Sequence, residues 1–150
     1  MLKLNPRAAK LLLNFYGPYL GAGVRVRYIS PDWKEIRVSM KLHFYNRNAV
    51  GTHFGGSLYS MVDPHVMLML MHLLGEDYVV WDKAAKVEFV SPGKGTVSSK
   101  ISIQEDELRE IIYFTNSGEA YFPEFDIQVL NQEGGLVAKI RKTLYVRKKR

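Results

Sequence analysis

Residues 48–63 hold the combination of residues best suited to chemistry in this chain. The pair Gly55-Gly56 stands directly before a long apolar run, where a helix is expected to begin. A helix N-terminus favours negative charge, and glycine lets a bound molecule approach the backbone closely. Asp63 adds a carboxylate eight residues after Gly55. From these parts a site for a developing oxyanion beside a carboxylate can be built.

Each of these residues also has a purely structural interpretation. The glycine pair could form a tight loop before a helix, and Asp63 directly before Pro64 could be the N-cap of a following helical segment. Asn48 lies in the polar turn 46–48, where Asn is favoured without any role in binding. The residue types alone leave both interpretations open.

Other common catalytic groups are absent or poorly placed. The chain has no Cys, which excludes disulfide bonds, thiolate metal sites and Cys nucleophiles. Asp63 and His65 lie two residues apart and so face different sides of a helix, and His43, His53 and His72 complete no spaced metal site. Ser57 lacks the second glycine of a nucleophile elbow. We therefore expect no metal ion, no cofactor and no serine-hydrolase mechanism.

The elements around this segment begin with a short helix. Asn5 as N-cap and Pro6 as first helical residue predict its start, and Gly17-Pro18 predicts its end, so the helix covers residues 7–16.

Alternation of apolar and polar residues then predicts about six antiparallel strands. They cover residues 24–28, 36–44, 79–90, 96–104, 122–130 and 136–147. Residues 91–93 and 131–135 are predicted hairpin loops. The acidic start 105–107 and the helical spacing of the apolar residues after it predict a small helical insertion.

Residues 55–74 predict one long central helix. From 66 to 71 the run is apolar on nearly all sides, so protein or lipid must surround it. A membrane span needs about 20 mostly apolar residues, whereas this run contains Asp63, Pro64 and His65. We expect a buried helix kinked at Pro64, and no membrane span. A curved antiparallel sheet wrapped around it gives an α+β fold, and a second copy of the chain would complete the covering as a symmetric dimer.

The segment 48–63 resembles the signature of hot-dog-fold thioesterases. In that signature an Asn in a loop, a Gly-Thr pair, a Gly-Gly pair opening the central helix, and an acid eight residues after the first of those glycines recur together. The matching residues here are Asn48, Gly51-Thr52, Gly55-Gly56 and Asp63. The likeness continues through residues 81–89 and 92–95, and is closest to a branch of uncharacterised tetrameric acyl-CoA thioesterase-like proteins. It implies a single hot-dog domain over residues 1–150 that hydrolyses acyl-CoA as a homodimer or a dimer of dimers.

The resemblance assigns roles to matching positions. Gly55 would donate its backbone N–H to the thioester oxygen, Asp63 would act as general base or nucleophile, and Asn48 would position the water or the substrate. Many relatives have His where Phe54 stands, whereas this chain has its His one residue earlier. Further substrate contacts are expected from His53, Phe54, Gly56 and Met67, with Lys94 and Arg141 holding the CoA phosphates.

One spacing argument needs no family knowledge. Gly55 and Asp63 would lie about 12 Å apart along a continuous helix, while reacting atoms must come within about 3–3.5 Å. One helix cannot present both groups to one thioester. Two antiparallel copies about a two-fold axis could, which predicts a site shared between subunits.

Composition limits the remaining choices. The 150 residues match one globular domain, and the net charge of +6 owes much to the basic residues within 139–150, of which the last four, 147–150, are expected to be a solvated chain end. We expect attraction of coenzyme A and no nucleic-acid partner. No long apolar stretch precedes residue 7, so a cytoplasmic protein without a signal peptide is expected. A hot-dog hydratase or dehydratase and a non-catalytic acyl-CoA-binding module stay open as alternatives.

Overall fold

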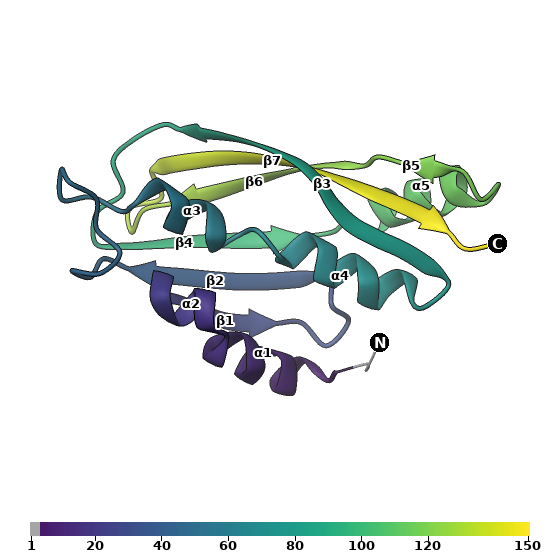
Figure 1. Ribbon diagram of the computed structural model, residues 1–150, viewed down its shortest axis with the longest axis horizontal. Helices are drawn as coiled ribbons and strands as arrows, with labels where there is room; N and C mark the ends of the chain where they lie inside the picture. The colour runs from purple at the N-terminus through teal and green to yellow at the C-terminus, as the bar shows by residue number, and fades with distance from the viewer. Residues whose placement is uncertain (1–3) are drawn as a thin grey trace.

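A curved antiparallel sheet packs around two short helices in the computed structural model, which describes residues 4–150 (Figure 1). The helices are α1 (Pro6–Phe15), α2 (Gly17–Ala22), α3 (Gly55–Ser60), α4 (His65–Leu74) and α5 (Glu105–Thr115). The strands are β1 (Val24–Ile29), β2 (Glu35–Lys41), β3 (Tyr78–Phe89), β4 (Thr96–Ser102), β5 (Ala120–Tyr121), β6 (Glu124–Leu130) and β7 (Leu136–Lys148). Their order in the sheet is β1-β2-β4-β6-β7-β3, and β5 pairs with β7 off this path. The predicted α+β fold with a wrapped helix is confirmed.

The central helix is two helices. The helix predicted over residues 55–74 is interrupted before the predicted kink at Pro64 and restarts after it, because α3 ends at Ser60, residues 61–64 form turns, and α4 begins at His65. Proline has no backbone N–H and its ring clashes with the preceding turn, so Pro64 stands where the helix is interrupted, as its type predicts. The side chain of Asp63 does not cap α4. The carboxylate is therefore directed to other partners.

The N-terminal helix begins as predicted, with Asn5 Oδ1 accepting a hydrogen bond from the Ala8 N–H at 2.8 Å and Pro6 in the first turn. It ends at Phe15. The predicted stop at residues 17–18 is instead the start of the second helix, α2, because Pro is favoured in the first turn of a helix as well as beyond its end.

The core lies between the inner face of the sheet and α4. In α4, Val66, Met69 and Leu70 are fully buried, and they share one core with inward-pointing residues such as Val38 of β2 and Leu144 of β7. Strand β2 ends at Lys41 rather than near residue 44. The cause is a turn at residues 43–46, whose buried Asn accepts from the His43 N–H and donates to the carbonyl oxygens of Lys41 and Ala22.

Strand β3 forms one edge of the sheet. Its only neighbour along the sheet is β7, with Val80 opposite Val146 and Phe89 opposite Ala138. The other side of this 12-residue strand has no partner strand within residues 4–150. In the same described part of the chain, no helix has the length and apolar character needed to cross a membrane.

Candidate active site

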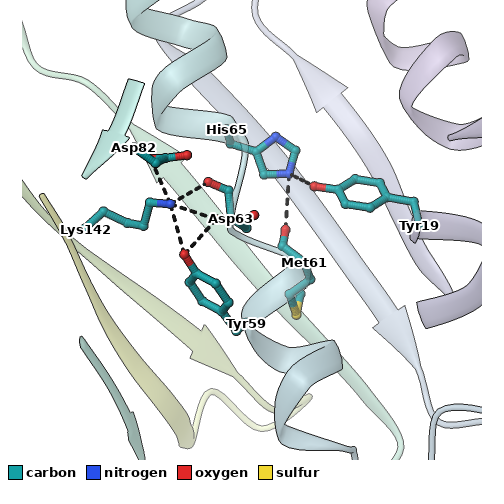
Figure 2. A network of polar contacts seen from close by, with 7 residues as sticks. All are labelled: Tyr19, Tyr59, Met61, Asp63, His65, Asp82 and Lys142. Atoms are coloured by element: carbon teal, nitrogen blue, oxygen red, sulfur yellow. Dashed lines mark hydrogen bonds and ion pairs between the residues drawn. The ribbon is translucent and has the colours of Figure 1, made fainter. Parts of the chain in front are cut away.

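Asp63 lies in the turn between α3 and α4 and is fixed by two side chains (Figure 2). The Tyr59 hydroxyl donates to Asp63 Oδ1 at 2.7 Å, and Lys142 Nζ donates to the same oxygen at 2.8 Å. Lys142 also donates to the backbone carbonyl oxygen of Asp63 at 2.9 Å. The side chain of Asp63 remains 45% exposed. The carboxylate is thus anchored on one side and open on the other.

Lys142 lies in the middle of β7, and its side chain points inward with no exposed surface. Besides Asp63, its ammonium group lies 2.8 Å from Asp82 Oδ1 on β3 and donates to the Tyr59 hydroxyl at 3.1 Å. A buried charge is tolerated only where it is paired and hydrogen-bonded. Two carboxylates and a hydroxyl provide that pairing, so three distant segments of the chain meet at one cation.

The network separates the pKa values of its two carboxyls. Burial alone raises the pKa of Asp63, but hydrogen bonds from Lys142 and Tyr59 outweigh it, and the pKa lies below its usual value. Burial raises the pKa of Asp82, and Lys142 only partly offsets this effect. For Lys142, burial lowers the pKa, but its hydrogen bonds to Asp63 and Tyr59 and its ion pair with Asp82 dominate and raise it. At neutral pH Asp63 is therefore ionised and Lys142 is charged.

His65 lies beside this network but faces the other way. Its Nε2 lies 2.7 Å from the Tyr19 hydroxyl and 3.1 Å from the carbonyl oxygen of Met61 (Figure 2). The side chain is fully buried, and burial lowers the pKa of His65 to about 4. Its imidazole is neutral at physiological pH and ties the α3–α4 turn to α2.

Gly55, Asn48 and His53 meet at a second place, a groove of about 410 Å³. Its other lining residues include Phe89 and Val90 at the end of β3 and Pro92 and Gly93 in the following loop. The backbone N–H groups of Gly55 and Gly56 donate to no group in residues 4–150, as expected for the first turn of a helix. These two free N–H groups lie at the N-terminus of α3, where Gly55 lines the groove.

The side chain of Asn48 is already committed to its own loop. Its Nδ2 donates to Thr52 Oγ1 at 2.9 Å and to the carbonyl oxygen of His53 at 3.3 Å, while its Oδ1 accepts from the N–H groups of Val50 and Thr52. This is the behaviour expected of a turn-forming Asn. A direct contact from Asn48 to a substrate or water requires that one of these bonds be exchanged.

The other predicted binding residues around the groove differ in exposure. His53 is buried, with its backbone N–H bonded to Gly93 O and its Nε2 2.9 Å from Gly95 O. Since a carbonyl only accepts, Nε2 carries the proton, and Nδ1 has no partner within residues 4–150. Phe54 and Gly56 are exposed beside each other at the start of α3, and Lys94 is exposed in the loop that His53 holds.

The structure does not bring the remaining two predicted residues to this groove. Met67 lines an apolar cavity of about 350 Å³ between α1 and α4, together with Leu13 and Pro64. Arg141 lies on the outer face of the sheet, where it binds the Asp126 carboxylate through Nε at 2.8 Å and Nη2 at 3.1 Å. Asp63 itself does not line the groove of Gly55.

Sequence reasoning missed Lys142, Tyr59 and Asp82. A signal for Lys142 was present, because the alternation of β7 places it on the inward face between Ile140 and Leu144. An inward Lys in an apolar series predicts a buried acidic partner. Residues 4–150 contain no group of three or more His, Cys, Asp or Glu side chains placed to hold a metal ion.

The comparisons with known proteins agree with this architecture. A family model described as a domain of unknown function (DUF4442) matches residues 6–146. The chain belongs to this family. No curated protein sequence matches this DUF4442 chain.

Solved structures show which fold this DUF4442 domain has. A Pseudomonas aeruginosa protein of unknown function described as a probable thioesterase superposes with a TM-score of 0.81 at 17% identity, covering 95% of each chain. A Haemophilus influenzae thioesterase gives 0.70 at 15% identity, covering 97% of this chain and 92% of its own. PaaI of the E. coli phenylacetic acid degradation operon gives 0.62 at 16% identity, covering 93% and 90%. The predicted hot-dog fold is confirmed.

Proposed function

We propose that this chain hydrolyses acyl-CoA thioesters, with Asp63 as the attacking group and the backbone N–H of Gly55 as oxyanion donor. The observation that carries the proposal is the half-exposed, anchored and ionised carboxylate of Asp63. Structural neighbours described as thioesterases support the reaction class. A lowered pKa makes a carboxyl a weak general base near pH 7 but keeps it ionised for nucleophilic attack.

The proposed reaction has two steps. The Asp63 carboxylate attacks the thioester carbonyl carbon, the carbonyl oxygen becomes negative against the Gly55 N–H, and the C–S bond breaks. The CoA thiolate leaves and takes a proton from water, and the acyl group remains on Asp63 as an anhydride. A water molecule then hydrolyses the anhydride to a free carboxylic acid, and Asp63 returns to its carboxylate by releasing a proton that neutralises the hydroxide left when the thiolate was protonated. The reaction consumes one water and needs no cofactor.

Within one chain the two reacting groups lie near different parts of β3, one near its last residue, Phe89, and the other near Asp82 in the first half of the strand. The Gly55 groove is closed by Phe89, whereas Asp63 is linked through Lys142 to Asp82. Phe89 lies seven residues after Asp82, roughly 23 Å at the rise of an extended chain. Because reacting atoms must approach within about 3.5 Å, we infer that one chain alone does not bring both groups to one substrate.

A second copy of the chain resolves this separation. The unpaired edge of β3 is a template for another strand, and Ala84 and Ala85 at its centre are small and exposed. Antiparallel pairing of two β3 strands about an axis between Ala85 and Lys86 places Phe89 of one copy opposite Asp82 of the other. We propose that this dimer forms two equivalent sites, each with Gly55 from one chain and Asp63 from the other.

The rest of the substrate has proposed places as well. The apolar cavity that Met67 lines reaches Pro64, the residue directly after Asp63, and is suited to an acyl chain. Lys94 stands exposed beside the Gly55 groove, where it can attract the CoA phosphates. Assembly of dimers into a tetramer, the CoA carrier and a cytoplasmic location stay predictions.

The test is a thioesterase assay with acyl-CoAs of several chain lengths, following release of free thiol. The wild-type protein should release thiol from at least one chain length, and Asp63→Asn should retain fold and assembly but lose turnover at least about 100-fold. Asp77→Asn, at an exposed Asp elsewhere, is the matched control. Binding of acyl-CoA without thiol release would favour a binding module, and hydration of an enoyl-CoA with its thioester intact would favour a hydratase.

A further inference from the structure

Lys142 is the most tightly enclosed charged group among residues 4–150. Its side chain has no exposed surface, yet it contacts two acidic side chains and a hydroxyl from two other segments, residues 59–63 and β3. Buried ion pairs are weak contributors to stability, because desolvation opposes their attraction. Because the buried ion pairs of Lys142 add little to stability, its contact with Asp63 is the place to seek a functional role for this cation.

The bonds from Lys142 make the two oxygens of Asp63 different. Oδ1 accepts from both Tyr59 and Lys142, and Lys142 also binds the backbone oxygen of the same residue. Oδ2 accepts no hydrogen bond from any group in residues 4–150. Three bonds from two donors thus hold Asp63 in one orientation, with a single free oxygen.

Asp82 competes for the same cation from the opposite side. Its Oδ1 lies 2.8 Å from Lys142 Nζ, and its side chain is 28% exposed on the edge strand β3. Tyr59, which binds both Asp63 and Lys142, is the other titratable group that contacts Asp63, and the neutral His65 and Tyr19 lie close enough to interact with its charge. Among these neighbours only Asp82 can place a second negative charge next to Lys142. Asp82 therefore determines how strongly Lys142 interacts with Asp63.

We propose that Lys142 is a positioning residue for the attack by Asp63: it clamps Oδ1 and the backbone so that Oδ2 is the reacting atom, and Asp82 sets the strength of this clamp. The inference rests on the proposed function, because it assigns a role within that reaction. It adds two residues to the site that no sequence motif indicated.

The clamp predicts opposite effects from two substitutions. Lys142→Met keeps the apolar stem but removes the charge, so the acid limb of the kcat/KM profile should move up by about one to three pH units as Asp63 becomes harder to ionise. Asp82→Asn leaves the cation to Asp63 alone, so the acid limb should move down. In Lys142→Met, kcat should fall about 100-fold with little change in KM, because a misplaced nucleophile affects the reaction more than binding.

Two further variants keep the test decisive. Lys142→Arg retains the charge and should restore the position of the acid limb. Lys142→Met combined with Asp82→Asn removes one positive and one negative charge together, so it avoids an unpaired buried Asp82 if the single variant does not fold. Acid limbs that coincide with wild type, or that move in the same direction in Lys142→Met and Asp82→Asn, would overturn the proposal.

A measurement without substrate separates this inference from the proposed function. In protein labelled with ¹³C at Asp carboxyl carbons, the Asp63 signal, assigned by its loss in Asp63→Asn, should titrate at higher pH in Lys142→Met and at lower pH in Asp82→Asn. A titration unchanged by both substitutions contradicts the clamp even if the enzyme is active. Expected titrations in a protein that releases no thiol would contradict the thioesterase proposal alone.

Discussion

The ring of Phe89 lies over Gly55 so closely that a Cβ atom at Gly55 would be 2.9 Å from the ring Cζ. Phe89 is at the end of the edge strand β3, and Gly55 opens α3, so this contact joins the central helices to the sheet edge. The Phe89 side chain is 60% exposed and can turn away. A larger residue at position 55 would therefore change the groove rather than the fold.

Gly55→Ala should reduce kcat/KM about 100-fold, because the added methyl group stands where a thioester must approach the backbone donor. Thermal unfolding should change little. Gly21→Ala is the matched control, since a Cβ there meets no atom within 4 Å. Steady-state kinetics with the preferred acyl-CoA checks the pair, and equal activity of both variants would remove Gly55 from the reacting site.

A shared site predicts complementation between inactive variants. Gly55→Ala and Asp63→Asn proteins are unfolded together and refolded at equal concentration, so about half of the dimers are mixed by random pairing. One site of each mixed dimer receives both substitutions and the other receives neither, and total activity should recover to about a quarter of wild type. Each variant refolded alone is the control. Mixed dimers demonstrated by mass spectrometry but without activity would place the site within one chain.

The two carboxyls around Lys142 give stability opposite dependences on pH. Burial raises the pKa of Asp63, but Lys142 and Tyr59 more than reverse this, so the folded value is depressed. Its stabilising contribution is present above the unfolded value of about 4 and is lost as pH falls through the folded value. Burial raises the pKa of Asp82, whose contribution is present below about pH 4 and is lost as pH rises through its folded value.

Free energies of unfolding in urea between pH 2 and pH 7 test these signs. When the pH is lowered, the free energy of unfolding should fall less in Asp63→Asn than in wild type. When the pH is raised from 3 to 6, it should increase more in Asp82→Asn than in wild type. Asp77→Asn serves as control for the loss of an exposed carboxylate. Stability curves that run parallel in all four proteins would show that folding leaves both carboxyls unperturbed.

Lys94 and Arg141, both predicted to hold CoA phosphates, should now behave differently. Lys94→Ala should raise KM up to about fivefold, the range that an exposed charge pair gives, and should weaken the rise of KM with salt. Arg141→Ala should leave KM unchanged, because Arg141 is paired with Asp126 on the outer face of the sheet. A larger effect at Arg141 than at Lys94 would move the CoA site to that face.

Patterns that repeat along one element were readable from the sequence. Strand β2 alternates buried Ile36, Val38 and Met40 with more exposed neighbours, and α5 begins with the acidic residues 105–107, as predicted. Interruptions were harder to interpret. Proline is common both after the end of a helix and in its first turn, so Gly17-Pro18 predicts a stop from the sequence although it is the start of α2. The strand β5 has only two residues, which is too short for a periodic pattern.

The residues of the candidate site also fall into two groups, those that lie close together in the sequence and those that only the fold brings together. Gly55, Asn48 and Asp63 stand in one short segment and could be proposed from it, although Asn48 turns out to bind its own loop. Lys142 lies 79 residues from Asp63 and meets it only after β7 has entered the sheet. No local pattern contains such a contact, which depends on tertiary placement of an inward-pointing side chain.

The position of β7 also determines when the site can exist during folding. Asp63 and Asp82 precede β7 in the chain, yet Lys142 must reach both, and within residues 4–150 β7 is the only strand next to β3 in the sheet path. Contacts between residues so far apart in the sequence form slowly, because the entropy cost of closing the long loop between them comes before the contacts can stabilise the chain. A nascent chain that has made its central helices therefore still lacks an oriented carboxylate. We expect catalytic competence to be acquired after most of the secondary structure, when β7 closes the sheet.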